Sequence, residues 1–178
     1  SSVTDFRTFA FDCSSLTTLD VSNWDTSSVT DFGNFARDCS SLTTLDVSNW
    51  DTSSVTDFGN FARDCSSLTT LDVSNWDTSS VTDFRTFAFD CSSLTTITVN
   101  GGTGNPFADS PCIDYGDAFS NTDLDQTSID NILVAIEAAG TSNGTFDQSG
   151  GFAPSITGEA AIDALRGRGW TITVTGGY

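Results

Sequence analysis

The sequence predicts an α/β leucine-rich-repeat solenoid, with short parallel strands on one face, short helices on the other and an irregular, capped C-terminal part. The first observation is a 26-residue unit, and segments 29–54 and 55–80 are identical copies of it. The second is that leucines recur at fixed offsets in each copy; a period of about 20 to 29 residues with such leucines is typical of this architecture. The copies begin at Val3, Val29, Val55 and Val81.

The near-identical repeats occupy residues 1–99, and residues 100–178 form a second segment of divergent repeats and a C-terminal cap. Each repeat alone buries too little apolar surface to be stable, so stability is expected from contacts between neighbouring repeats. The chain starts inside a repeat. This start predicts a mature product or an excerpt whose targeting segment is absent.

A short strand is predicted at residues 42–47 and at the equivalent positions of the other repeats, because the segment fits the pattern L-x-x-L-x-L. Side chains alternate across a strand, so Leu45 and Val47 are expected to point inward. The outward positions are Thr44, Asp46 and Ser48.

A turn and a short helix are predicted to follow each strand. Trp50 lies in the turn and is expected to stack on its equivalents Trp24 and Trp76. Ser54 is predicted as the helix N-cap, with Asp57 closing a capping box. The apolar residues that follow have spacings of 3, 3, 1 and 3, which places them on one helical face packed against the strands. They are Val55, Phe58, Phe61, Ala62 and Cys65.

The C-terminal segment is predicted to begin with a loop at residues 100–106. A helix is expected next, with Thr127 and Asp130 as its capping box and Gly140 as its end. Its apolar stripe consists of Ile129, Ile132, Leu133 and Ile136.

The chain is then predicted to form a strand at 144–148, a helix at 159–166 and a final strand at 170–174. The inward residues of the helix are Ile162 and Leu165. Leu124, Phe146 and Ile172 are separated by 22 and 26 residues, a spacing that fits further, irregular repeats.

The segment 42–58 and the phrase Phe-Ala-x-Asp-Cys-Ser-Ser-Leu resemble the 26-residue repeat of bacterial surface leucine-rich-repeat proteins, the BspA-like class. Members of that class usually carry methionine where this chain has Phe32 and Phe35, so the core here is more aromatic. The phrases at 139–145 and 168–174 are similar to the endings of leucine-rich-repeat proteins of environmental bacteria and phages. The resemblance implies a secreted, cell-surface or virion-surface protein used in adhesion.

The charge of the chain excludes several classes of partner. It has 24 acidic residues, 6 basic residues and a formal charge of −18, which repels nucleic acid and anionic membrane surfaces. No apolar run approaches the roughly 18 to 20 residues that a membrane span needs, so membrane insertion is not expected. Surface proteins and glycans stay as predicted partners, together with self-association.

Several motifs typical of catalytic sites are also missing from the sequence. It has no histidine, no Gly-x-Ser-x-Gly elbow and no glycine-rich phosphate loop before a helix. Two carboxylates about 5 Å apart occur in retaining glycosidases. Here the same aspartate recurs in each repeat, whereas catalysis needs an acid and a base in unlike environments. We therefore predict that the protein is not an enzyme and has no cofactor, with calcium as the one ion considered.

The outward strand positions form the predicted binding face. They are Thr18, Asp20, Ser22, Thr44, Asp46, Ser48, Thr70, Asp72 and Ser74. Asp20, Asp46 and Asp72 would lie about 5 Å apart on parallel strands, and a calcium ion bridging them would offset their repulsion. The alternative is a solvated acidic face. The rows of threonine hydroxyls also suggest ice binding as a function, which the aspartates between them disfavour.

Cysteines recur once per repeat, at Cys13, Cys39, Cys65 and Cys91, with Cys112 outside the series. Equal spacing predicts a row of buried thiols rather than pairs, because free cysteine behaves as a small apolar residue. A disulfide between adjacent repeats is also geometrically conceivable at about 5 Å. Zinc is not expected without a histidine or a Cys-x-x-Cys pair.

Up to residue 96, the copies differ only on the side opposite the strands. These positions predict a possible contact surface, because outward aromatic residues mark interfaces; packing of each phenylalanine under a flanking segment is the alternative. Its members are Arg7, Phe11, Arg37, Arg63, Arg85 and Phe89. Together the observations predict a non-enzymatic extracellular module for adhesion or binding. The alternative is a structural subunit of a fibre or a virion decoration protein, suggested by a first repeat without a polar cap.

Overall fold

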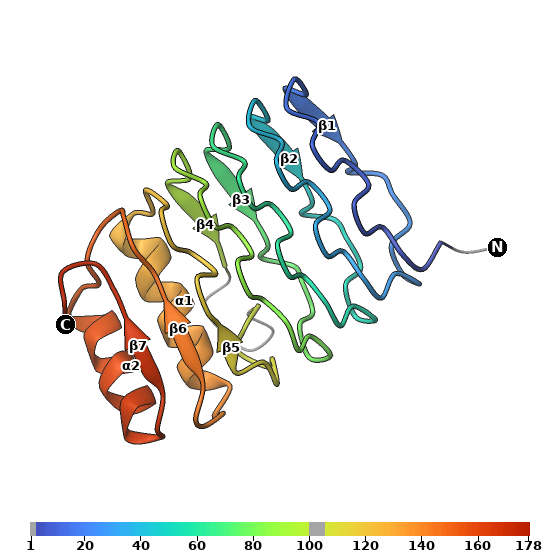
Figure 1. Ribbon diagram of the computed structural model, residues 1–178. Helices are drawn as coiled ribbons and strands as arrows, with labels where there is room; N and C mark the ends of the chain where they lie inside the picture. The colour runs from blue at the N-terminus through green and yellow to red at the C-terminus, as the bar shows by residue number, and fades with distance from the viewer. Residues whose placement is uncertain (1–2, 100–105) are drawn as a thin grey trace.

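The repeats stack in sequence order, each contributing one short strand to the same side of the molecule (Figure 1). The structure, a computed structural model, describes residues 3–99 and 106–178. The loop predicted at 100–106 therefore lies outside the described residues except for Pro106. We number the repeats 1 to 4 as residues 3–28, 29–54, 55–80 and 81–99. Their strands are β1 (Thr18–Asp20), β2 (Thr44–Asp46), β3 (Thr70–Asp72) and β4 (Thr96–Thr98).

The strands pair in parallel with the register that the sequence predicts. Leu19 of β1 lies opposite Leu45 of β2, and Leu71 of β3 lies opposite Ile97 of β4. The central residues of β2, β3 and β4 are buried, whereas β1 has a partly buried centre. The described strands form two separate two-stranded sheets here, β1–β2 and β3–β4, so β2 and β3 are neighbours without a regular ladder.

The helices predicted after each strand are wrong, because residues 3–99 contain turns at those positions. Short turn bonds alternate with bonds to the next repeat. The amide of Phe35 donates to the carbonyl of Phe32 at 3.1 Å, while the amide of Ala36 donates to Phe61 of repeat 3 at 2.9 Å. The amide of Asn34 likewise donates to Gly59 at 2.9 Å. These backbone groups bind their neighbours instead of closing a helix.

Left-handed residues explain why a helix does not form. Asn34 and Asp38 have φ values of 58° and 63°, a conformation that asparagine and aspartate tolerate better than other side chains and that a right-handed helix excludes. The predicted capping box is wrong for the same reason. The Asp57 carboxylate accepts from the amide of Gly59, two residues on, at 2.7 Å, and Ser54 donates to the carbonyl of Ser27.

Aromatic side chains fill the core between the strand side and the turn side. Trp76 stacks on Phe58 with ring centroids 4.4 Å apart and lies parallel to Trp50 at 6.4 Å, so the predicted stacking of indoles holds for this pair. Trp24 stacks instead on Phe6 at 4.8 Å. The indole nitrogen of Trp50 donates to the carbonyl of Val21 in repeat 1, which ties adjacent repeats together.

The C-terminal segment changes the pattern by placing helices on the strand side. Helix α1 packs against β4 and against α2, and the remaining strands form a three-stranded parallel sheet on the opposite side (Figure 1). No helix among residues 3–99 and 106–178 is long and apolar enough to cross a bilayer. The elements are β5 (Asp114–Tyr115), α1 (Gln126–Ala138), β6 (Thr145–Asp147), α2 (Ile156–Gly167) and β7 (Thr171–Thr173).

Most C-terminal predictions agree with these elements, and two need correction. The N-cap of α1 is Asp125, which accepts from the amide of Ser128, so the predicted box at Thr127 is wrong. Asp130 accepts instead from Ser155, the N-cap of α2. Leu124 is buried outside any strand, and β6 pairs with β5 rather than with a strand at that leucine.

Candidate functional site

The predicted strand face contains two adjoining hollows. One has a volume of about 210 Å³ between β1 and β2, and the other has a volume of about 350 Å³ between β2 and β3. Thr44 and Asp46 line both. The lining residues of the two hollows are Thr18, Leu19, Asp20, Ser22, Thr44, Leu45, Asp46, Ser48, Thr70 and Asp72. The ninth predicted residue, Ser74, donates its amide to Asp72 at 3.0 Å.

The aspartates of this face are held in place by serines two residues on, a role that the sequence analysis missed. The Asp46 carboxylate accepts from the Ser48 amide at 3.2 Å and from its hydroxyl at 2.8 Å. Asp20 and Ser22 form the same pair of bonds. These bonds lower the pKa of Asp20 below 3.8, and the bond from the Ser22 hydroxyl has a larger effect than the bond from the Ser22 amide. Asp20 is therefore an ionised acceptor with a fixed orientation at neutral pH.

The calcium prediction gains no support from this geometry. In residues 3–99 and 106–178, no group of three or more aspartate, glutamate, cysteine or histidine side chains is arranged to hold a metal ion. In each aspartate of the row, one carboxylate oxygen already accepts a hydrogen bond from the amide of the serine two residues on, as in Asp20, Asp46 and Asp72. Calcium needs 6 to 8 oxygen ligands, which this row does not gather around one point.

Four of the six residues of the predicted contact surface contact one another in pairs. The Arg37 guanidinium lies over the Phe11 ring at 5.4 Å, and the Arg63 guanidinium lies over the Phe89 ring at 5.2 Å. Phe11 is still 43% exposed. These pairs join side chains of successive repeats, so the arginines are engaged within the molecule.

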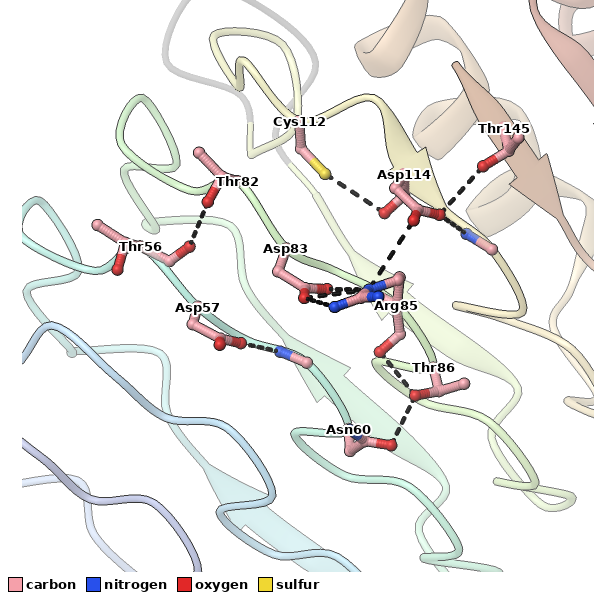
Figure 2. A network of polar contacts seen from close by, with 12 residues as sticks. Thr56, Asp57, Asn60, Thr82, Asp83, Arg85, Thr86, Cys112, Asp114 and Thr145 are labelled. Atoms are coloured by element: carbon pink, nitrogen blue, oxygen red, sulfur yellow. Dashed lines mark hydrogen bonds and ion pairs between the residues drawn. The ribbon is translucent and has the colours of Figure 1, made fainter.

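A second row of carboxylates follows the turn side. Asp31, Asp57 and Asp83 form successive parallel bridges, and Figure 2 shows the end of this row, where Arg85 lies between Asp83 and Asp114. Burial is the main cause that raises the pKa of Asp57, and the charges of Asp83 and Asp31 raise it further. A hollow of about 350 Å³ adjoins this point. It is lined by Gly59, Asn60, Asp83, Arg85 and Thr86.

The row extends into the C-terminal segment, which sequence reasoning missed. The Asp114 carboxylate accepts from the amide of Gly116 at 3.0 Å, as Asp57 does from Gly59. The Thr145 hydroxyl donates to the same carboxylate at 3.1 Å (Figure 2). The shared spacing of aspartate and glycine, Asp-x-Gly, was the available signal in the sequence.

All five cysteines are free thiols, and Cys39, Cys65 and Cys91 are buried as the spacing of the series predicts, whereas the same prediction is wrong for Cys13. The thiol of Cys65 donates to the carbonyl of Ala36 in the preceding repeat at 3.0 Å, and Cys39 does the same to Ala10. Burial raises the pKa of Cys39 to about 11. Cys13, in contrast, is exposed. The buried thiols therefore connect repeats and are poor nucleophiles.

The family described as "Mycoplasma protein of unknown function, DUF285" matches residues 1–102. No curated protein and no solved structure matches the chain.

Proposed function

We propose that this chain, which belongs to the family described as Mycoplasma protein of unknown function, DUF285, is a non-enzymatic binding module whose strand face holds a protein or glycan. The observation that carries this proposal is the pair of adjoining hollows between successive strands. Hydroxyl and carboxylate groups line both, and Thr44 and Asp46 are common to the two. A repeated ligand can therefore meet the same groups twice.

The proposed architecture is a leucine-rich-repeat solenoid related to the BspA-like surface proteins. Support comes from the parallel register of equivalent residues and from backbone bonds that join each repeat to the next. The proposed location is outside the cell, on a cell surface or on a virion.

The partner must supply hydrogen-bond donors. Asp20 is an oriented acceptor, and the chain carries a formal charge of −18, so phosphate-rich partners are repelled. Glycan hydroxyls and the basic side chains of a surface protein both provide donors. Threonine hydroxyls such as Thr44 can donate or accept in the same hollow.

The test is binding of the full chain to a panel of purified surface proteins and glycans. The double variant D46N/D72N removes the charges and retains an oxygen that accepts from the amides of Ser48 and Ser74. The matched control D51N/D77N makes the same change in the same repeats, at aspartates that bond Ser53 and Ser79 away from the hollows.

We expect D46N/D72N to weaken binding about tenfold or more, because hydrogen bonds to charged groups contribute roughly 1.5 to 3 kcal/mol. The control should bind like the unmodified chain. Equal binding by both double variants would overturn the assignment of the strand face.

Self-association is a second candidate function, favoured by the exposed side of repeat 1. Phe9 is 50% exposed, whereas its equivalents Phe35, Phe61 and Phe87 are fully buried. A fibre subunit or a virion decoration protein can use such an apolar edge for assembly. Light scattering at rising concentration tests this candidate: a mass that increases in the unmodified chain and not in F9S supports it, and a constant monomer mass excludes it.

A further inference from the structure

The four repeats are of two types, which differ at three positions that we call the variable triplet. Type A carries arginine, threonine and phenylalanine, and type B carries glycine, asparagine and arginine. Every repeat thus contains one arginine, at the first position of the triplet in type A and at the last in type B. The type A triplets are Arg7, Thr8 and Phe11 in repeat 1 and Arg85, Thr86 and Phe89 in repeat 4. The type B triplets are Gly33, Asn34 and Arg37 in repeat 2 and Gly59, Asn60 and Arg63 in repeat 3.

The last position of the triplet makes a contact wherever the two types meet. Phe11 of repeat 1 lies under Arg37 of repeat 2, and Phe89 of repeat 4 lies under Arg63 of repeat 3. Arginine over an aromatic face is attractive and covers the ring. Both boundaries between unlike repeats therefore have one cation–π pair.

The first position makes a second contact, which reaches forward along the stack. Arg7 binds Asp5 of its own repeat and approaches Asp31 of the next repeat at 3.4 Å. Arg85 binds Asp83 and approaches Asp114 at 3.8 Å, as Figure 2 shows. An arginine at this position thus interacts with two successive carboxylates of the acidic row.

A glycine follows each of these arginines at the equivalent position of the next unit. Gly33 follows Arg7, and Gly116 follows Arg85 although it lies outside the near-identical repeats. A Cβ atom at Gly33 would lie 3.1 Å from the Asp31 carboxylate, and one at Gly116 would lie 3.0 Å from the Asp114 carboxylate. The glycine therefore leaves the carboxylate open to the arginine of the preceding unit.

Two type A repeats in succession do not satisfy these contacts. A second arginine in place of Gly33 would compete with Arg7 for Asp31, and two guanidinium groups would face each other. The two phenylalanines would also meet without a cation. Type B repeats tolerate each other, because Arg37 and Arg63 keep ion pairs with their own Asp38 and Asp64 at 3.2 and 2.9 Å.

We propose that the variable triplet selects the neighbour of each repeat: a type A repeat requires a unit with glycine at the first triplet position on its C-terminal side. The partner of this surface is thus another repeat of the same molecule. The triplet fixes the order in which nearly identical repeats stack. The proposed ligand site lies on the strand face and does not include the variable triplet. The inference therefore does not depend on the proposed function.

The test compares two rearranged chains that have the same composition as the natural one. In the alternating chain, repeats 3 and 4 exchange triplets and the order becomes A-B-A-B. In the blocked chain, repeats 2 and 4 exchange triplets and the order becomes A-A-B-B. Both share the changes R85G, T86N and F89R. The alternating chain adds G59R, N60T and R63F, and the blocked chain adds G33R, N34T and R37F.

We expect the alternating chain to melt no lower than the natural chain, because each type A repeat still precedes a glycine and each of its three boundaries between unlike repeats allows a cation–π pair. The blocked chain should melt about 2 to 6 °C lower, since it loses one cation–π pair and places two arginines side by side. Hydrogen exchange should locate the loss. The Thr8 amide, which donates to the carbonyl of residue 33 at 3.2 Å, should exchange faster in the blocked chain.

Circular dichroism at low temperature confirms that both rearranged chains are folded before melting. Lower stability of the blocked chain alone supports neighbour selection. Equal melting temperatures for the two orders, or equal protection of the Thr8 amide, would overturn it.

Discussion

Replacing one phenylalanine in the middle of the stack should cost far more than replacing its equivalent at the edge. Phe61 is fully buried and stacks between Phe35 at 5.5 Å and Phe87 at 5.4 Å. Phe9 occupies the same template position in repeat 1, stacks on Phe35 alone at 5.6 Å within that column and is 50% exposed. The two substitutions F61A and F9A therefore make the same chemical change in two packing environments.

Removing a fully buried phenylalanine costs about 3 to 5 kcal/mol, because burial is lost and a cavity remains. Phe61 also loses stacking on both faces, and each aromatic pair contributes about 0.5 to 1.5 kcal/mol. Half burial of Phe9 sets a lower cost of about 1 to 2 kcal/mol. We expect F61A to lose at least 2 kcal/mol more than F9A.

Urea denaturation followed by tryptophan fluorescence measures both losses. In addition, F61A removes the ring of repeat 3 that stacks on both repeat 2 and repeat 4, so its transition should broaden or separate into two steps. F9A should retain one transition with a slightly lower midpoint. If the two variants lose equal stability, the chain does not derive its stability from stacking between repeats, and the reasoning is refuted.

Three further predictions concern close packing, charge and thiol reactivity. G144A should lower the unfolding free energy by about 1 to 3 kcal/mol, because a Cβ atom at residue 144 would lie 2.5 Å from an indole carbon of Trp170. In the control variant G167A, the added Cβ atom meets nothing within 4 Å. Equal melting temperatures of the two variants would contradict this prediction. The pKa of Asp57 is raised above 3.8, so the folded state holds more protons than the unfolded state and stability falls as pH rises from 3.8 through the folded-state pKa. D57N should flatten that part of the urea-midpoint profile, and an unchanged profile would exclude the effect. A thiol reagent at pH 8 should label Cys13 rapidly and Cys39, whose pKa is about 11, slowly; mass spectrometry that finds equal rates would disprove burial.

The strand side was predictable because a two-residue alternation and a fixed leucine spacing have one simple solution. Leu45 and Val47 are buried where the pattern places them. The turn side was not, because apolar residues at spacings of three and four also fit consecutive turns. Asn34 and Asp38 carried the signal, since both adopt left-handed φ values. Backbone bonds to the next repeat then satisfy groups that a helix would pair internally.

The candidate site was predictable in its composition and less so in its structure. Outward strand residues do line the hollows, but alternation alone says nothing about the serine that holds each aspartate, such as Ser48 on Asp46. Among the variable positions, Arg7, Phe11 and Arg85 are exposed, whereas Arg37, Arg63 and Phe89 are half-buried. Their pairing depends on which repeat lies next to which, as with Phe11 and Arg37, and this is a property of the stack.

Segments 29–54 and 55–80 are identical and each bonds mainly to its neighbours. A gene that gains or loses one such unit by recombination keeps both ends of the protein intact. Each added type B unit would lengthen the molecule by about 4.8 Å, the distance between adjacent strands. It would also add one more carboxylate and hydroxyl set, so length and valency increase together. Under the proposed function, avidity for a repetitive ligand would be adjustable by copy number, without any new contact evolving.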